Sequence, residues 1–418
     1  MGLNPPVDIA LIGAGNRSRT TYAPIFDFVR PWANLVAVCD PVVEHADALS
    51  DRLDVPAFYS LPDLVKARPM EAALVVAPVD IHHGIACYLM QHGIHCHVET
   101  TISSLLLQAK EMVQTAADNN VTLRVAENFF RFPFDRIAKR IADSGAIGDV
   151  HRLLTMYDHT GYHNNSRWIH FMGAYPETVQ AIKHTMPTTR YTEAAHRIHT
   201  SEGYRAHFFH FPGNRLVVDQ AANIKGLLGR YPRPGYTEIA GGRGAIVRAA
   251  TDQNVYRRGW TSEAEVRLVS DEALDTYAAA DQVFPIVHEA QDGIWTRDYV
   301  DLPGGRVEYT NPYPVPPDIN AAHAHRDYYA VAIVDHIIDF AQAVRGVKQS
   351  EYTDRDALMA MEMEVATRES ALRQGAPVAL PLTGDLESEE RVRKELRAKH
   401  GVDPLDIEGM IGVKVPRP

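Results

Sequence analysis

The strongest constraint on this chain is an apolar run that ends in a glycine turn. Val7–Gly13 reads VDIALIG, which is typical of a short buried strand, and the turn GAGNRS occupies residues 13–18. In this G-x-G-x-x-S pattern, Gly13 and Gly15 allow a tight turn that leaves backbone N–H groups bare at a helix start, where they can face a pyrophosphate. Ser18 stands where a third glycine or alanine is usual, which loosens helix–strand packing but leaves the anion site intact. A strand before the turn and a helix after it favour dinucleotide binding.

The end of the next predicted strand carries an acid. Asp40 closes the apolar run Asn34–Asp40. An acid at this place of a dinucleotide-binding domain takes the ribose 2′-hydroxyl. Pro41–Ala46 contains no Arg or Lys that would neutralise a 2′-phosphate. We therefore expect NAD, rather than NADP, to be the cofactor.

Apolar runs alternate with helical patterns as far as about residue 130. Three more predicted strands are Ala72–Ala77, Ile94–Val98 and Val121–Val125. The pattern of Ser103–Asn119 predicts a helix between two of them, with the Ser-Ser start as its cap. Strands that alternate with helices indicate a parallel sheet. The prediction is an α/β chain that begins with a Rossmann fold.

The pattern changes after about Arg131. A predicted helix at Phe134–Ser144 and a glycine turn at residues 145–148 are followed by longer strands with few helices between them, which favours a mostly antiparallel sheet. The predicted strands are Val150–Tyr157, Tyr204–Phe211, Arg215–Ile224, Tyr236–Ile239 and Ala245–Arg248, with a hairpin turn at Pro212–Asn214. Two helices are expected at Asp327–Ala343 and Asp354–Arg373. We predict an NAD-binding Rossmann domain at residues 1–130, a substrate-binding and oligomerisation domain at 131–385, and a charged tail or closing arm at 386–418.

Composition argues against several classes of partner, location and metal site. A formal charge of -11 argues against a nucleic-acid partner, which requires a surplus of Lys and Arg. No apolar stretch approaches the ~20 residues of a membrane helix, and the first residues lack a basic signal-peptide region, so we expect a cytoplasmic protein. Cys39, Cys87 and Cys96 are predicted to be buried reduced thiols, and their spacing fits no zinc site.

Several short motifs occur in an order that resembles the Gfo/Idh/MocA family of oxidoreductases. They are PVDIH at 78–82, GIHCHVE at 93–99, RFP at 131–133, GAIG at 145–148, EIAGGRG at 238–244 and the last helix with its ending at 353–381. The resemblance covers roughly residues 7–382. It implies a Rossmann domain plus an α+β domain with an open-faced sheet, a site at their junction, and homodimers or homotetramers. It also implies hydride transfer between NAD(P) and a sugar, cyclitol or related alcohol.

The resemblance assigns further residues to the cofactor. Glu99 would contact the nicotinamide ribose, and Arg17 either touches the pyrophosphate or lies in a solvated helix start. His82 is interpreted as structural or substrate-orienting rather than as a base. The full set of expected cofactor-binding residues is Gly13, Gly15, Asn16, Arg17, Ser18, Asp40, Pro78, His82, Glu99, Thr100 and Asn128.

The chain departs from the family pattern at the expected proton-transfer site. The family's Glu-Lys-Pro is Glu99-Thr100-Thr101 here, and Thr100 cannot act as a base at neutral pH. The second signature is HTGYH at 159–163, in which His163 matches the family histidine and His159 stands where an Asp is usual. A histidine exchanges protons near neutrality. The predicted catalytic residues are His163, His159, Tyr162 and Asp158, with pocket lining as the alternative for Tyr162. His159 and His163 could also ligate a metal at i,i+4 on a helix, but the match favours catalysis and we predict no metal site.

Glu127-Asn128 and Tyr157-x-His159 also resemble a divergent branch, the NAD-dependent glycoside hydrolases similar to α-N-acetylgalactosaminidases and sulfoquinovosidases. These enzymes oxidise a sugar carbon transiently, eliminate the aglycone, add water and re-reduce the sugar. We favour this activity. The alternatives are a net dehydrogenase of a sugar or cyclitol and a non-catalytic NAD-binding regulator. The substrate is expected to be a sugar or glycoside, and Arg131, Arg152 and Arg167 would form a pocket for an anionic one.

Overall fold

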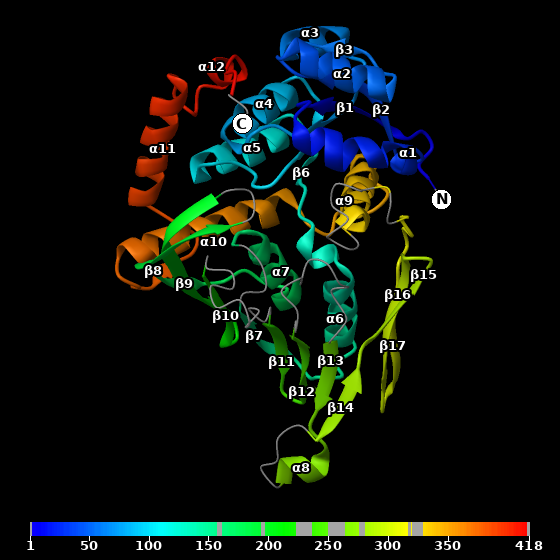
Figure 1. Cartoon of the computed structure of the whole chain (residues 1–418), viewed down its shortest axis with the longest axis vertical. Coiled ribbons are helices and arrows are strands. Elements are labelled where there is room, and N and C mark those ends of the chain that lie inside the picture. Colours follow the sequence, from blue (N-terminus) through cyan, green and yellow to red (C-terminus); the bar gives the residue numbers. More distant parts are fainter. Residues whose placement is uncertain are drawn as a thin grey trace.

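The first sheet of the computed structural model has the strand order of a dinucleotide-binding domain (Figure 1). The structure describes residues 2–156, 161–193, 197–222, 236–249, 264–275, 281–316, 319 and 329–415. Six parallel strands lie in the order β3-β2-β1-β4-β5-β6. They are β1 (Val7–Ile12), β2 (Ala33–Cys39), β3 (Ala57–Phe58), β4 (Ala72–Val75), β5 (His95–Val98) and β6 (Leu123–Val125). All the strands predicted before residue 130 are therefore present, and strand order reverses beside β1, where such sheets bind ligands.

Helices α2 (Val43–Leu53), α3 (Leu61–Ala67), α4 (His82–Gln91) and α5 (Leu106–Asp118) connect these strands. The predicted serine cap of α5 is wrong. The helix begins after Leu105, whose N–H donates to Gln108 Oε1 at 3.1 Å, while Ser103 Oγ donates to the Leu105 carbonyl. The helix after the glycine turn is also irregular, with a π-helical turn at Ser18–Tyr22, a 3-10 turn at Ala23–Ile25 and α1 at Phe26–Val29. Pro24 lies in this 3-10 turn and lacks the N–H that a regular helix would use.

The second sheet has nine strands in the order β14-β13-β12-β11-β7-β10-β9-β8-β18 and forms the lower half of the molecule in Figure 1. Its pairs are antiparallel except β7 with β10, as the spacing of the strand patterns predicted. The strands are β7 (Val150–Met156), β8 (Thr178–Glu193), β9 (Arg197–Phe211), β10 (Arg215–Ala222), β11 (Tyr236–Gly241), β12 (Gly244–Ala249), β13 (Ala264–Leu268), β14 (Gln282–Pro285) and β18 (Val378–Ala379). The sequence prediction missed β8, β13, β14 and β18.

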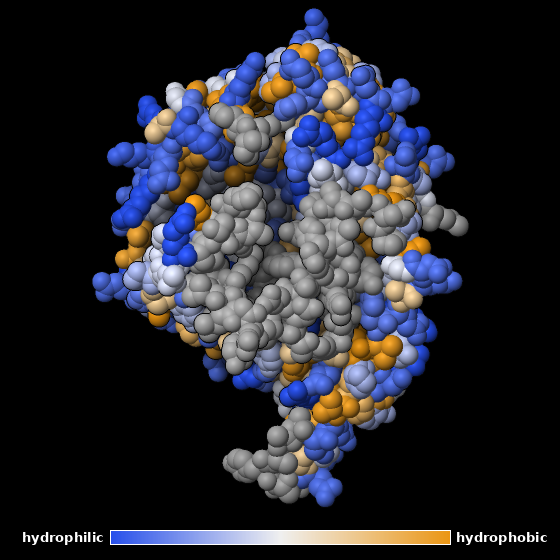
Figure 2. All heavy atoms as spheres, viewed as in Figure 1, coloured by the Kyte–Doolittle hydropathy of each residue, from blue (hydrophilic) through white to orange (hydrophobic). Residues whose placement is uncertain are grey.

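A third sheet was not foreseen. It joins β15 (Val287–Gln291), β16 (Ile294–Leu302) and β17 (Gly305–Thr310), and its last two strands pack against α6 (Pro133–Asp143). Short helix α8 (Asp271–Asp275) follows β13. In Figure 2, apolar side chains gather near β14, where Val283 is 54% exposed.

Helices that follow the first sheet in the chain pack between the sheets. α9 (Tyr329–Val344) packs against α1, β2 and β5, and α10 (Asp354–Leu372) contacts both β8 and α5. α7 (His163–Met172) packs against β7 and α10. The charged segment after residue 385 is an ordered arm with α11 (Glu387–His400) and α12 (Ile407–Ile411), and α12 lies beside α4 (Figure 1). β6 ends at Val125 and α6 begins at Pro133, so the domain boundary near residue 130 stays a prediction.

The three cysteines are free and buried, as expected. Burial raises the pKa of Cys39 and of Cys87 to about 12, so both thiols stay protonated at neutral pH. No helix within the described residues is both long and apolar enough to cross a bilayer.

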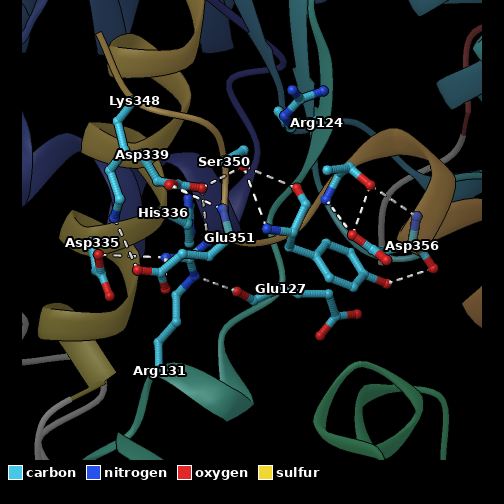
Figure 3. A network of polar contacts seen from close by, with 12 residues as sticks. Arg124, Glu127, Arg131, Asp335, His336, Asp339, Lys348, Ser350, Glu351 and Asp356 are labelled. Atoms are coloured by element: carbon cyan, nitrogen blue, oxygen red, sulfur yellow. Dashed lines mark hydrogen bonds and ion pairs between the residues drawn. The ribbon is translucent and has the colours of Figure 1, made fainter. Parts of the chain in front are cut away.

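A buried ionic network connects the segment between β6 and α6 to α9 (Figure 3). Arg131 is 2% exposed and contacts Asp339 at 3.1 Å, Asp335 at 3.4 Å and Glu351 at 3.8 Å. Its Nε donates to the Glu127 carbonyl at 3.1 Å. Burial opposes the charge of Arg131, but the carboxylates around it hold its pKa above the usual value. The network fixes the position of Glu127, which directly follows the first sheet.

We predict that Arg131→Ala lowers the free energy of unfolding by roughly 3–5 kcal/mol, because it leaves the buried Asp339 without its cation. Arg30→Ala is the matched control, since its ion pair with Asp27 is exposed and should add little. Urea denaturation followed by circular dichroism measures both variants. Equal effects of the two substitutions would contradict the structural role of the network.

Candidate functional site

The glycine turn is held in a close contact between β1 and β4. Gly13 has a φ of +98°, and a Cβ at this position would lie 2.4 Å from the Val76 carbonyl oxygen. Its N–H donates to the Cys39 carbonyl at 2.8 Å. Ser18 Oγ donates to the Gly13 carbonyl at 2.5 Å, so the serine in place of the third glycine fastens the turn to the helix. Only glycine fits at residue 13.

Asp40 lies where the sequence placed it, at the end of β2 and beside the glycine turn. Its carboxylate is fully buried and accepts hydrogen bonds from Ala14 N at 2.6 Å and from Val42 N at 2.9 Å. These bonds fix the carboxylate at the carboxyl edge of the sheet. The cradle at Gly13 and the fixed acid at Asp40 together fit a dinucleotide with its pyrophosphate at the turn and a ribose at the acid.

Two pockets flank the turn and share Ala77 and Pro78 as a common wall. The first, of about 350 Å³, is on the Asp40 side and is called the adenosine pocket below. The second, of about 700 Å³, is called the reaction pocket. The residues that line the reaction pocket are Gly15, Asn16, Arg17, Arg19, His45, Val76, Ala77, Pro78, Glu99, Thr100, Tyr162, His163 and Tyr329. Within the described residues, most of the predicted cofactor and catalytic residues thus line these two adjacent pockets.

Glu99 is fixed at the floor of the reaction pocket. Its Oε1 accepts from Arg17 Nε and from Tyr22 OH, both at 2.7 Å, and its Oε2 accepts from Thr100 N at 2.9 Å. Burial disfavours the carboxylate, but Arg17 and the hydrogen bonds hold its pKa below the usual value. The Arg17 guanidinium also lies 5.3 Å from the centre of the Tyr329 ring. Arg17 is therefore an ion-pair partner of Glu99 at the pocket, and not part of a solvated helix start.

Two predicted cofactor residues lie behind the pocket wall. His82 is 1% exposed, and its ring nitrogens contact the Thr101 carbonyl at 2.9 Å and the Ala77 carbonyl at 2.8 Å. Asn128 is 1% exposed and donates to Tyr329 OH at 3.2 Å. Neither residue lines the two pockets, so direct contact with the cofactor is corrected to support of the residues that do line them.

Tyr162 and His163 lie at the start of α7 and line the reaction pocket together with Thr100. His163 Nδ1 is 3.0 Å from Glu127 Oε2, which also accepts from Ser166 Oγ at 3.3 Å. Tyr162 OH lies 3.5 Å from Thr100 Oγ1. Burial is the largest cause that raises the pKa of Tyr162 to about 12. Glu127 was noted in the sequence only as part of a motif, and its contact with His163 was missed.

His159 and Asp158 lie outside the described residues, so their predicted catalytic roles stay predictions. Among the described residues, no group of three or more His, Cys, Asp or Glu could hold a metal ion.

The predicted anion pocket of three arginines is wrong. Arg131 belongs to the network with Asp335, Asp339 and Glu351. Arg167 binds Asp135 through two hydrogen bonds of 2.9 Å, and Arg152 pairs with Glu238 on the second sheet. Each guanidinium has a carboxylate partner, and none of the three lines the reaction pocket.

Comparison with known proteins identifies the first domain. Residues 7–127 match the GFO_IDH_MocA model, described as an oxidoreductase family with an NAD-binding Rossmann fold. Residues 7–127 thus match the Gfo/Idh/MocA family and its NAD-binding fold, as the sequence predicted. The roles of the Gly13 turn and of Asp40 in holding NAD stay predictions.

The curated relatives match over short segments. An uncharacterized oxidoreductase from Streptococcus pneumoniae is 28% identical over 128 residues, which are 31% of this chain and 33% of that protein. The 2,7-anhydro-N-acetylneuraminate hydratase of Mediterraneibacter gnavus is 28% identical over 28% of this chain and 31% of its own length. A glycosyl hydrolase family 109 protein from Streptomyces coelicolor is 26% identical over 45% of this chain and 41% of its own length. The matches thus span well under half the length of each relative.

Solved structures resemble this chain over most of its length. An oxidoreductase from Agrobacterium radiobacter, in complex with NAD+, L-tartaric acid and magnesium, has a TM-score of 0.63 at 16% identity, covering 89% of this chain and 98% of that one. The WlbA dehydrogenase from Bordetella pertussis, with NADH and UDP-GlcNAcA, has a TM-score of 0.61 at 16% identity, covering 90% and 99%. At this identity the likeness concerns the fold, and it confirms the predicted Rossmann domain followed by an α+β domain.

We predict that Gly13→Ala abolishes measurable NAD binding, because the added Cβ needs the space of the Val76 carbonyl and the residue has a positive φ. Gly145→Ala is the matched control, because Gly145 also has a positive φ, of +76°, but no atom lies within 4 Å of its added Cβ. Titration with NAD in a calorimeter measures both. NAD binding by Gly13→Ala with unchanged affinity would contradict the fit of the cofactor to this turn.

Proposed function

We propose that this protein is an NAD-dependent enzyme that acts on a sugar, and that it hydrolyses a glycoside through transient oxidation of a ring carbon. The observation that carries the proposal is the placement of Tyr162 and His163 in the reaction pocket beside Thr100, the residue that replaces the family lysine. An oxidation–elimination cycle needs a group that takes a proton and a group that donates one, and an imidazole and a phenol can serve these two roles.

His163 is the proposed base. The Glu127 carboxylate accepts a hydrogen bond from Nδ1–H at 3.0 Å, which leaves Nε2 as the nitrogen with a lone pair. Ser166 Oγ and the start of α7 keep this pair in place. A buried carboxylate holds such an imidazole in one tautomer and one orientation, so that the Nε2 lone pair can face a sugar hydroxyl.

Tyr162 is the proposed acid. Its pKa of about 12, raised mainly by burial, keeps the phenol protonated at neutral pH. A protonated phenol can donate to an oxygen on which negative charge develops, such as that of a departing aglycone or of an enolate. Thr100 Oγ1 lies within hydrogen-bond distance of the phenol oxygen, at 3.5 Å, and carries no charge.

In the proposed cycle, NAD would supply the hydride acceptor for the first step and the hydride donor for the last. His163 takes the hydroxyl proton of the carbon that is oxidised and passes it to solvent. His163 then takes the proton of the adjacent C–H, which the new carbonyl makes acidic, while the aglycone leaves with the proton of Tyr162. Water adds to the resulting double bond: its hydroxide joins the carbon that lost the aglycone, its proton restores Tyr162, and His163 returns the carbon-bound proton. Reduction of the carbonyl then takes one proton from solvent.

The relatives support this proposal through their names alone. One is a glycosyl hydrolase family 109 protein and another is a hydratase of an anhydro sugar, and neither name describes net oxidation. Net dehydrogenation of a sugar or cyclitol is the second candidate, favoured by the fold shared with the WlbA dehydrogenase. The same base would serve both reactions, so the fate of the hydride decides between them.

We also propose that the chain forms a homo-oligomer through its open sheet. Ile182, Met186 and Ile198 of β8 and β9 are 43%, 42% and 56% exposed. Apolar side chains on one sheet face are typical of an interface between subunits.

We expect the protein with NAD to release aglycone from at least one member of a panel of neutral and anionic aryl glycosides, without net formation of NADH. Aglycone absorbance and NADH absorbance at 340 nm, recorded together, measure this. Stoichiometric NADH from free sugars would favour the dehydrogenase instead. Neither signal, despite NAD binding, would favour a non-catalytic regulator.

We further predict that Tyr162→Phe and Glu127→Gln lower kcat by roughly 10²–10⁴-fold, because each removes part of the proton-transfer machinery. NAD affinity should remain within a factor of about two, because neither side chain holds the glycine turn or Asp40. Tyr204→Phe is the matched control, since it removes a hydroxyl that binds Gln220 on the second sheet. An unchanged kcat in Tyr162→Phe would refute the role of Tyr162.

A further inference from the structure

The C-terminal arm, residues 386–415, forms one wall of the adenosine pocket. The residues that the Rossmann fold contributes to the pocket include Asp40, Val42 and Leu61, and those of the arm include Met410, Ile411 and Val413. The arm therefore reaches the half of the crevice that lies beyond Asp40, on the far side of the glycine turn from the reaction pocket. A volume of about 350 Å³ between apolar walls is suited to one half of a dinucleotide.

The arm is anchored beside the pocket by ion pairs. Asp80, in the turn that follows Pro78, accepts from Lys399 Nζ at 2.6 Å and from His400 Nε2 at 3.0 Å. Burial opposes the Asp80 carboxylate, but these two groups hold its pKa below the usual value. Because Pro78 lines both pockets, the anchor joins the arm to the wall that the two halves of the crevice share.

Hydrogen bonds to α5 hold two further points of the arm. Glu389 accepts from Leu106 N at the start of the helix, and Gln108 Nε2 donates to the Pro404 carbonyl at 2.7 Å. Both Glu389 and Gln108 are buried. The start of α5, which the sequence assigned to a serine cap, is thus completed by the arm.

The last helix of the arm lies directly on α4. A Cβ on Gly84 would be 2.8 Å from Met410 Cβ, so the approach of α12 to α4 requires a glycine there. Met410 is 1% exposed, and Asp406 caps α12 by accepting from Gly409 N at 3.0 Å. The helix is therefore packed like part of the domain core, and it places residues 411–415 over the pocket.

We propose that the C-terminal arm completes the adenosine site and slows the release of NAD. The apolar side chains of Ile411 and Val413 cover the adenosine half of the cofactor, so this half leaves only after the arm moves. The nicotinamide half, in the reaction pocket, has no contact with the arm among the described residues that line that pocket. The inference rests on NAD binding and holds for either proposed reaction.

The test is the release of NADH from the purified full chain, chased with excess NAD and followed by NADH fluorescence in a stopped-flow instrument. Two variants are compared with it, a chain that ends after Gly401 and the full-length double variant Ile411→Ala/Val413→Ala. We expect the dissociation rate constant to rise on the order of tenfold or more in both. Arg391→Ala is the control within the arm, because its ion pair with Glu387 is exposed and distant from the pocket lining.

Fragments of the cofactor make the test specific. The affinity for ADP-ribose should fall in both variants, whereas the affinity for nicotinamide mononucleotide should not change. Unchanged NADH release in a folded variant, or equal weakening of both fragments, would overturn the proposal. If the shortened chain does not fold, the full-length double variant decides. No turnover is measured, so the outcome is independent of the glycosidase assay.

Discussion

The contact between Gly13 and the Val76 carbonyl is the constraint on which the site depends. It brings β1 and β4 together at the point where strand order reverses, and it needs a residue without a side chain. The turn that results lies next to Asp40 on one side and Glu99 on the other, each fixed by backbone N–H donors. The crevice is therefore rigid where the cofactor would lie, and the variable chemistry is left to residues of α7.

Much of the first sheet could be predicted because its strands are short apolar runs that are buried on both faces, which is a local signal. The turn and Asp40 were equally local. The third sheet was not, and the closing arm was predicted only as the alternative to a tail, since their positions depend on contacts with α6 and α4 that no short segment encodes. β8 was missed because its sequence alternates little between apolar and polar residues over Thr178–Glu193.

The site residues also divide into those that a local pattern predicts and those whose role depends on contacts across the fold. Tyr162 and His163 were found from a motif, but the Glu127–His163 contact joins residues that are 36 positions apart and required the fold. The three arginines taken for an anion pocket show the opposite error. Arg167 meets Asp135 over 32 positions, and Arg131 meets Asp339 over 208, so their charges are already paired inside the protein. Charge in a sequence indicates a ligand only when its internal partners are known.

The arm also determines when the adenosine pocket is completed during synthesis of the chain. Domains fold as units while the chain is synthesised, with N-terminal regions first. The glycine turn and Asp40 leave the ribosome early, but Lys399 follows its partner Asp80 by 319 positions. During that interval the nascent Rossmann domain has its turn and its acid without the wall from residues 408–415. The adenosine pocket is therefore complete only after the arm has been synthesised, although its other wall belongs to the part of the chain that is made first.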